Sequence, residues 1–208
     1  ARRRRPAPDA RLVTRSVASP EPKTIGVLAL QGDYEAHSRA LERAGARVVE
    51  VREIADFARI DGLVIPGGES TTMLKLLREE KLFDALAAFA RSKPVFGTCA
   101  GAILLASKVT NPDQESLGVV DIDVQRNAYG SQLDSRIVKL PVAGIDGGDL
   151  EAVFIRAPII RRAGANTTVL ASYAGDPVLV RYGRHLVATF HPELTSDSRV
   201  HRLFVDNV

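Results

Sequence analysis

Cys99 is the candidate nucleophile of this chain and its single cysteine. It lies in the stretch PVFGTCAG, between Gly97 and Gly101, where an apolar run gives way to a helical pattern. This spacing matches the G-x-nucleophile-x-G elbow, in which a sharp turn from strand to helix exposes the reactive side chain. Glycines leave room where the backbones approach, and the first N–H groups of the helix favour a thiolate and hold an oxyanion. The alternative is a small cysteine buried in the core.

A thiolate nucleophile needs a base that handles protons and a group that orients that base. His191, in ATFHPEL, follows a buried strand, and Pro192 favours an extended backbone before it. Side chains two residues apart in extended chain point the same way, so Glu193 is expected beside His191. The pattern predicts a Cys99–His191–Glu193 triad. The alternative is a polar turn, in which Glu193 only favours the start of the last helix.

The other three histidines lack such a setting. His37 and His201 fall within helical patterns and His185 lies beside a hairpin turn, which predicts solvated or structural roles. The sequence also lacks the motifs of a zinc deaminase, of a phosphate-binding loop and of a dinucleotide-binding turn. One cysteine cannot supply the paired cysteines of a zinc deaminase. The chain has no Walker A loop and no G-x-G-x-x-G after its first strand.

Alternating strands and helices must bring these residues together. The first half predicts strands at 24–30, 47–52, 62–68 and 93–97 and helices at 33–46, 70–92 (one or two) and from 100 onward. The second half predicts strands in closer succession, at 117–130, 151–158, 168–174, 178–182 and 185–190. A last helix is expected within 195–208, with Thr195 or Ser196 as its N-cap. The fold class is therefore α/β, a flavodoxin-like three-layer sandwich. Its central sheet is mainly parallel, with helices on both faces, added antiparallel strands and ligands at the carboxyl ends of the strands.

Composition predicts a single globular domain at 24–208, preceded by a disordered basic tail at 1–23. The tail has an excess of five positive charges, more than the +3 of all 208 residues, so the remainder is net negative and gives no argument for nucleic-acid binding. The tail reads as a non-functional extension, a targeting sequence or a binding arm. No apolar run approaches the roughly 20 residues of a membrane span. A lone cysteine favours the reducing cytoplasm.

Six loop motifs extend the pattern along the chain. They are LALQGDYEAH, IPGGESTTM, GTCAGAILLA, RNAYGSQ, FIRAP and FHPEL, in that order. Together they resemble the class I glutamine amidotransferases, whose glutaminase domains use a Cys–His–Glu triad on an α/β sheet. Within that class, their order is similar to the glutaminase subunit family of pyridoxal 5′-phosphate synthase. The resemblance covers residues 24–208.

The resemblance implies roles for the remaining motif residues. The N–H groups of Gly68 and Ala100 would form the oxyanion hole. Gln31 matches a position linked to activation at the contact with the synthase. The positions implied to bind glutamine are Gly68, Glu69, Ser70, Arg126, Ile155 and Arg156. Both arginines suit a carboxylate, because a guanidinium can bind it through two hydrogen bonds. The alternative is that each arginine pairs with a surface acid.

The family resemblance also implies an activity, hydrolysis of L-glutamine to glutamate and ammonia. The ammonia would pass to a (β/α)8-barrel synthase in a hetero-oligomer, with no metal and no cofactor in this chain, and no nucleic-acid or membrane partner. Three alternatives remain. They are a glutaminase of another amidotransferase (histidine or purine pathway), a cysteine peptidase or γ-glutamyl hydrolase, and a binding module without catalysis.

Overall fold

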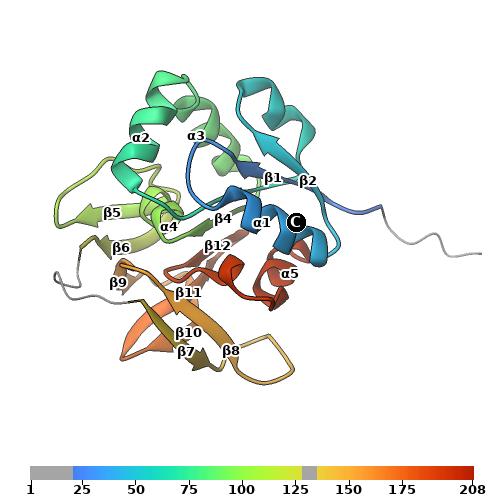
Figure 1. Ribbon diagram of the computed structural model, residues 1–208. Coiled ribbons are helices and arrows are strands. Elements are labelled where there is room, and N and C mark those ends of the chain that lie inside the picture. The colour runs from blue at the N-terminus through green and yellow to red at the C-terminus, as the bar shows by residue number, and fades with distance from the viewer. Residues whose placement is uncertain (1–20, 128–134) are drawn as a thin grey trace, which may run out of the picture.

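A seven-stranded sheet forms the centre of the computed structural model, which describes residues 21–127 and 135–208 (Figure 1). In the order in which they pair, its strands are β10 (Thr167–Tyr173), β11 (Asp176–Tyr182), β12 (His185–Ala188), β4 (Val95–Thr98), β3 (Gly62–Ile65), β1 (Thr24–Leu28) and β2 (Arg47–Val51). The five strands from β12 to β2 run parallel, whereas β10 and β11 are antiparallel additions. The predicted mainly parallel sheet with antiparallel strands is confirmed.

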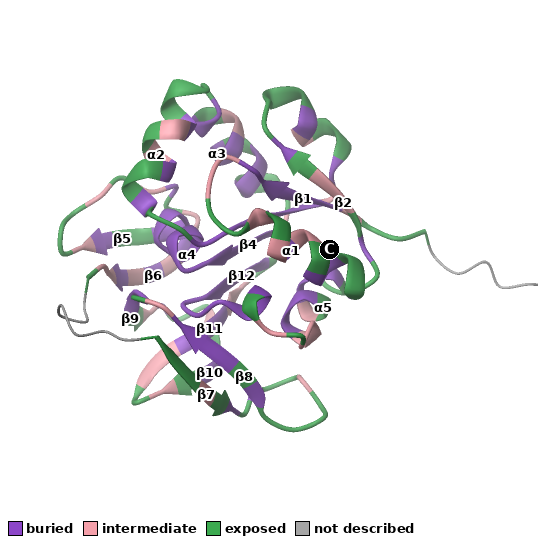
Figure 2. Cartoon of the chain, viewed as in Figure 1, coloured by how far each residue is buried: buried purple, intermediate pink, exposed green. Residues whose placement is uncertain are grey.

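Helices cover both faces of this sheet because its strands are apolar on both sides. Leu63 and Ile65 of β3 belong to one buried cluster, and Val64 between them belongs to the other. On the first face lie α2 (Ser70–Glu79), α3 (Phe83–Ser92) and α4 (Ala100–Leu105). On the second lie α1 (Tyr34–Arg43) and α5 (Arg199–Val205), which contact each other (Figure 1). Figure 2 shows the buried strands between these layers.

Two small sheets extend the sandwich. One contains β5 (Ala106–Thr110), β6 (Val120–Gln125) and β9 (Ile159–Ala163). The other pairs β7 (Arg136–Leu140) with β8 (Leu150–Phe154). Short 3-10 helices complete the chain, η1 (Ile54–Arg59) and η2 (Pro192–Leu194). The ends of β6 and β8 lead into the segments that carry Arg126 and Arg156, so the small sheets position two predicted site residues.

The stretch 70–92, predicted as one or two helices, forms two, separated at Lys81, whose φ of 59° ends the helical path. Two other local expectations are corrected. The helix after Cys99 is only six residues long and continues as β5. The last helix begins at Arg199, after Ser198, because the Thr195 hydroxyl accepts from the N–H of Asp197 and shapes a turn that precedes the helix.

The predicted tail, residues 1–23, lies outside the described residues except for its last three. Within residues 21–127 and 135–208, no helix is both long and apolar enough to cross a membrane.

Candidate active site

Cys99 occupies a strained turn between β4 and α4. Its φ of 48° and ψ of −101° lie outside the regions that L-residues favour. The flanking glycines are sterically required. A Cβ on Gly97 would lie 2.6 Å from the Gly101 carbonyl oxygen, and one on Gly101 would lie 2.2 Å from the Ile65 carbonyl oxygen. The backbone therefore has the tight turn of a nucleophile elbow, as the G-x-C-x-G spacing predicts.

The cysteine is less open to solvent than the elbow pattern suggests. Only 7% of Cys99 is exposed, which corrects the expectation of an exposed nucleophile. The reason is the loop after β3, since a Cβ on Gly67 would lie 3.3 Å from the Cys99 Cβ. Cys99 nevertheless lines a cavity of about 300 Å³ that also contains His191. A small substrate would reach the thiol through this cavity.

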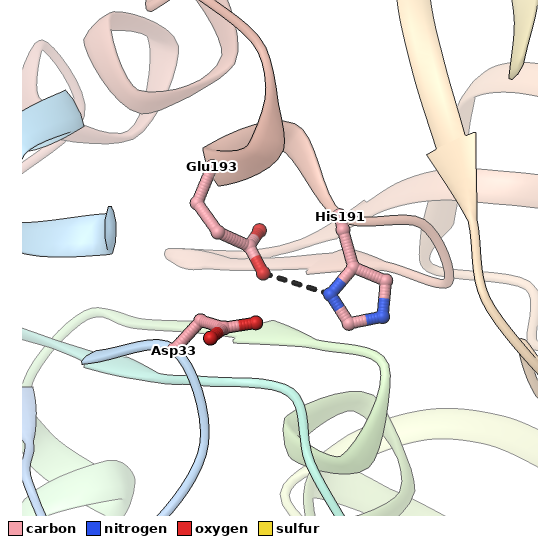
Figure 3. Close-up of side chains that lie close together, drawn as sticks. All are labelled: Asp33, His191 and Glu193. Atoms are coloured by element: carbon pink, nitrogen blue, oxygen red, sulfur yellow. Dashed lines mark hydrogen bonds and ion pairs between the residues drawn. The ribbon is translucent and has the colours of Figure 1, made fainter. Parts of the chain in front are cut away.

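His191 and Glu193 lie together where β12 has ended (Figure 3). The His191 N–H donates to the Val153 carbonyl oxygen at 2.8 Å, and the ring precedes Pro192 at the start of η2. Nδ1 of the ring lies 2.7 Å from Oε1 of Glu193, in a buried contact. The carboxylate thus lies beside the ring, as the spacing H-P-E predicts, but Glu193 reaches it from the 3-10 helix η2 and not from the extended chain that the prediction assumed.

The pKa of His191 reflects both of its partners. Burial lowers this pKa, but hydrogen bonds to Cys99 and Glu193, together with their charges, outweigh burial and raise it to about 10. At neutral pH the ring is therefore an imidazolium that lies between the sulfur of Cys99 and the carboxylate of Glu193. The fold therefore brings Cys99 and His191 together, although they are far apart in the sequence.

The cavity combines charges of both signs. Its lining residues are Asp33, Gly68, Glu69, Ser70, Cys99, Ile103, Arg126, Asn127, Ile155, Arg156, Pro158 and His191. All six predicted glutamine-binding residues are among them. Ala100 is buried at the first position of α4, where a helix leaves N–H groups without an intrahelical acceptor. The arrangement suits a small zwitterion with its reactive end toward Cys99.

Glu69, the residue before Ser70, is the N-cap of α2. The Glu69 carboxylate accepts from the N–H groups of Thr71 and Thr72, at 3.0 and 2.6 Å. Ser70 is buried instead, and its hydroxyl donates to Gln114 Oε1 at 2.9 Å. The cap is Glu69 because its longer side chain folds back over the first turn.

The arginines follow β6 and β8. One guanidinium nitrogen of Arg126 lies 3.5 Å from Glu69 Oε1 and 2.9 Å from the Thr71 hydroxyl. Arg126 does pair with an acid, but that acid also lines the cavity. Arg156 is exposed, with a φ of 42°. The rest of the RNAYGSQ motif beyond Asn127 lies outside the described residues.

The cap makes the stability of α2 depend on pH. Burial raises the pKa of Glu69, but the N–H groups of Thr71 and Thr72 outweigh it and lower the pKa to about 2, against an ordinary 4.5. A depressed pKa gives stability that is complete above pH 4.5 and is lost as pH falls toward 2. The side chain is 53% exposed, so solvent screening keeps the effect below about 1 kcal/mol.

Glu69→Gln, which retains an amide oxygen but does not titrate there, is the variant that tests this cap. Urea unfolding is expected to show wild type more stable at pH 6, with the difference shrinking by pH 3. A difference that stays constant over this range would contradict the assignment.

Gln31 forms hydrogen bonds with the loop after β3. Its carboxamide nitrogen donates to the Glu69 carbonyl oxygen at 3.1 Å, and its oxygen accepts from the Glu69 N–H at 3.3 Å. Gly68, with a φ of 134°, leaves the space, since a Cβ there would lie 2.6 Å from Gln31 Nε2. Gln31 therefore contacts the backbone of the predicted oxyanion loop and is not among the residues that line the cavity.

Asp33 is a cavity residue that the sequence analysis missed, although it follows the carboxyl end of β1, where such residues gather. Asp33, His191 and Glu193 have ligand-type atoms within 4.8 Å of one another (Figure 3). Of these three residues, His191 and Glu193 are hydrogen-bonded, through Nδ1 and Oε1 at 2.7 Å, so the carboxylate of Glu193 already engages the ring nitrogen on this side.

The remaining histidines are buried, which excludes the solvated roles allowed by the sequence. His37 and His201 are fully buried, and His185 is 7% exposed at the opposite end of β12 from His191. Burial of three polar rings cannot be read from a helical or hairpin pattern alone, because it depends on which elements pack together.

A strained cysteine elbow, a His–Glu pair and a charged cavity lie together at the carboxyl ends of parallel strands, which is the arrangement expected of a glutamine amidotransferase. The model of the SNO glutamine amidotransferase family matches residues 27–208, and the chain belongs to this family. A relative from Solibacter usitatus, "Pyridoxal 5′-phosphate synthase subunit PdxT", is 63% identical over 89% of this chain and 100% of its own length. The protein of the same name from Brevibacillus brevis is 50% identical, over 88% of this chain and 96% of its own.

Solved structures agree with the fold. A structure titled "Crystal structure of glutamine amidotransferase" superimposes with a TM-score of 0.82 at 46% identity, over 88% of this chain and 97% of the other. The structure of PurLQS from Thermotoga maritima has a TM-score of 0.57 at 17% identity, over 88% of this chain and 96% of the other. The second likeness shows the fold alone.

Proposed function

We propose that this chain is the glutaminase subunit of a pyridoxal 5′-phosphate synthase. It hydrolyses L-glutamine to glutamate and ammonia and supplies the ammonia to a synthase subunit. The observation that carries this proposal is the cavity in which Cys99 and His191 face two arginines and two acids. Membership of the SNO glutamine amidotransferase family and the names of the relatives support it.

Glutamine fits the charges of the cavity. The α-carboxylate binds the guanidinium groups of Arg126 and Arg156, and the α-ammonium binds Glu69. Ser70 and Ile155 complete the contacts around the substrate. The side-chain amide then extends toward Cys99, with its carbonyl oxygen on the N–H groups of Gly68 and Ala100.

The first half-reaction forms a thioester. The Cys99 thiolate attacks the amide carbon, and the oxyanion is held by the Gly68 and Ala100 N–H groups. Nε2 of His191 gives its proton to the leaving nitrogen, the C–N bond breaks, and ammonia departs. Glu193 keeps the ring oriented through Nδ1 and stabilises its positive charge.

The second half-reaction hydrolyses the thioester. Neutral His191 takes a proton from water as the oxygen attacks the thioester carbon. The C–S bond then breaks, which releases glutamate and restores the thiolate beside the imidazolium. Every group in this cycle belongs to the chain, to glutamine or to water, so neither a metal nor a cofactor takes part.

Ammonia is useful only where a second enzyme consumes it, so we place this chain in a hetero-oligomer with a (β/α)8-barrel synthase in the cytoplasm. Gln31 is the residue we link to activation, because it braces the backbone of the oxyanion loop. Docking at the loop after β1 would adjust Gly68 through this contact.

The predicted result is partner-dependent turnover. The isolated chain is expected to release ammonia from glutamine slowly, and the synthase subunit is expected to raise kcat by about tenfold or more, on the scale of typical coupling free energies. Ammonia release with and without the synthase measures this. Equal rates would contradict the partner dependence, and no glutamine hydrolysis in either case would contradict the proposed function.

γ-Glutamyl peptides separate the proposal from its enzymatic rivals, since a peptidase or γ-glutamyl hydrolase would cleave them and an amidotransferase would not. Stimulation by the pyridoxal phosphate synthase, and not by histidine or purine synthases, separates the related glutaminases.

A further inference from the structure

His37 contacts both the nucleophile elbow and the carboxylate of the proposed triad. It lies on α1 and is fully buried. Its Nε2 is 3.0 Å from the hydroxyl oxygen of Thr98, the residue before the nucleophile, and 3.3 Å from Oε2 of Glu193. Its Nδ1 is 2.9 Å from Nε2 of His201 on α5. A single ring thus contacts the elbow, the triad carboxylate and a second helix.

Apart from His37, the second carboxylate oxygen of Glu193, Oε2, has few polar contacts. Oε1 is occupied by His191, whereas Oε2 is buried and has no well-aligned hydrogen bond to any residue in 21–127 or 135–208. The Nε2 of His37 is its close polar contact. A buried carboxylate oxygen without such a contact would cost free energy and leave the group free to rotate away from His191.

The surroundings of His37 and His201 determine how many hydrogens their ring nitrogens carry. Burial, followed by the proximity of the His201 and His191 rings, lowers the pKa of His37 well below its usual value. Burial and the nearby Arg43 lower the pKa of His201 to about 3, so both rings are neutral at pH 7. Each ring therefore has one N–H.

One tautomer satisfies the close contacts. If the His201 hydrogen is on Nε2, that N–H donates to His37 Nδ1, and the His37 hydrogen on Nε2 faces Glu193 and Thr98. The opposite tautomers would point a His37 lone pair at the carboxylate. They would also leave a buried N–H on His201 Nδ1, which has no partner among the described residues.

We propose that His37 is a positioning residue for the triad. Its Nε2–H, shared between Glu193 Oε2 and the Thr98 hydroxyl, holds the carboxylate in the orientation that keeps Oε1 on His191. The inference rests on the proposed glutaminase function, because only turnover gives this orientation a consequence. His37 touches neither substrate nor the reacting atoms and acts through Glu193.

Two amide variants test the role of the Nε2–H specifically. His37→Gln places an amide near the position of Nε2 and keeps a donor toward Glu193. His37→Asn places its amide near Nδ1 and keeps only the group that faces His201. Both replace a buried ring by a buried amide, so they share the cost of a smaller side chain. His185→Asn is the control for loss of a buried histidine, since His185 contacts the Val95 N–H at the far end of β12.

Kinetics are measured with the synthase present and with glutamine as substrate. We expect kcat of His37→Gln within about threefold of wild type. We expect kcat of His37→Asn to be about 10- to 100-fold lower with KM unchanged, on the scale found for the partners that orient metal-bound histidines. His185→Asn is expected to unfold at a lower urea concentration and to keep kcat.

The pH dependence of kcat/KM distinguishes the two possible roles of His37, because it would not change if His37 were only structural. The groups that face His191 are Cys99, Glu193 and Asp33, and those around His37 are His201, Glu193 and His191, with Arg43 beyond His201. A displaced Glu193 stabilises the imidazolium less, so the alkaline limb of kcat/KM should move to lower pH in His37→Asn and remain in place in His37→Gln.

Equal kcat in the two amide variants, with a wild-type alkaline limb, would overturn the inference. Should His37→Asn not fold, His37→Met, which has no donor, takes its place with the same expected and opposing results. Failure of the proposed function is a separate result, because wild type itself would then release no ammonia.

Discussion

Replacing Cys99 with alanine is expected to abolish glutamine hydrolysis while leaving glutamine bound. Without the sulfur no thioester forms, and the loss in kcat should reach about 10⁴-fold or more, as for other triad nucleophiles. The fold should persist, because alanine also has a Cβ and meets the φ of 48° at the same backbone cost. Binding should persist because the arginines, Glu69 and Ser70 remain in the cavity. Ammonia release and titration calorimetry with glutamine, both with the synthase present, measure the two effects.

The control for Cys99→Ala is covalent labelling. A glutamine-like electrophile should alkylate wild type at Cys99, as peptide mapping would show, and should leave the variant unlabelled. Substantial ammonia release by Cys99→Ala, or no adduct at Cys99 in wild type with the synthase present, would contradict a thioester mechanism. The latter result would instead favour a binding module without catalysis.

Replacing Glu193 with glutamine is expected to produce the second-largest loss. The amide has the same shape but no charge, so the pKa of His191 should fall from about 10. A raised histidine pKa means that the imidazolium is present below that pH and is lost as pH rises through it. The alkaline limb of kcat/KM should therefore move to lower pH. By analogy with an amide in other triads, kcat should fall by about 10²- to 10⁴-fold.

Glu79→Gln is the matched control for this carboxylate-to-amide change. Glu79 lies at the last residue of α2, whose first residue, Ser70, lines the cavity, and its ion pair with Lys75 is exposed. Exposed pairs of this kind contribute little, so kcat and the pH profile should match wild type. An unshifted alkaline limb in Glu193→Gln would show that Glu193 does not set the charge of His191.

Much of the candidate site could be predicted because its signals are local. The elbow is encoded by Gly97 and Gly101, whose absent side chains leave room for carbonyl oxygens of neighbouring segments. The pairing of His191 with Glu193 could be predicted from the sequence H-P-E, but the backbone could not, because Glu193 lies in the 3-10 helix η2 and not in an extended chain. The parallel sheet followed from apolar strands that alternate with helices, since such strands need cover on both faces.

The features that could not be predicted depend on contacts between distant segments. His37 appeared as one more residue of an amphipathic helix, and only the packing of α1 against α5 and β4 places it beside Thr98 and Glu193. The Glu69 cap was missed because a serine next to it has the stronger general preference. The start of α5 was misplaced because the Thr195 turn is a short-range alternative to helix.

The glycines after β1 and β3 place a limit on how the active-site loops can be re-engineered. A Cβ on Gly32 would lie only 1.9 Å from the Gly67 carbonyl oxygen, so these two segments touch backbone to backbone. Side chains cannot be exchanged to relieve a mismatch there, since neither partner has one. A chimera that imports one segment from a distant homologue must therefore import the other with it, and library designs should treat the pair as a single module.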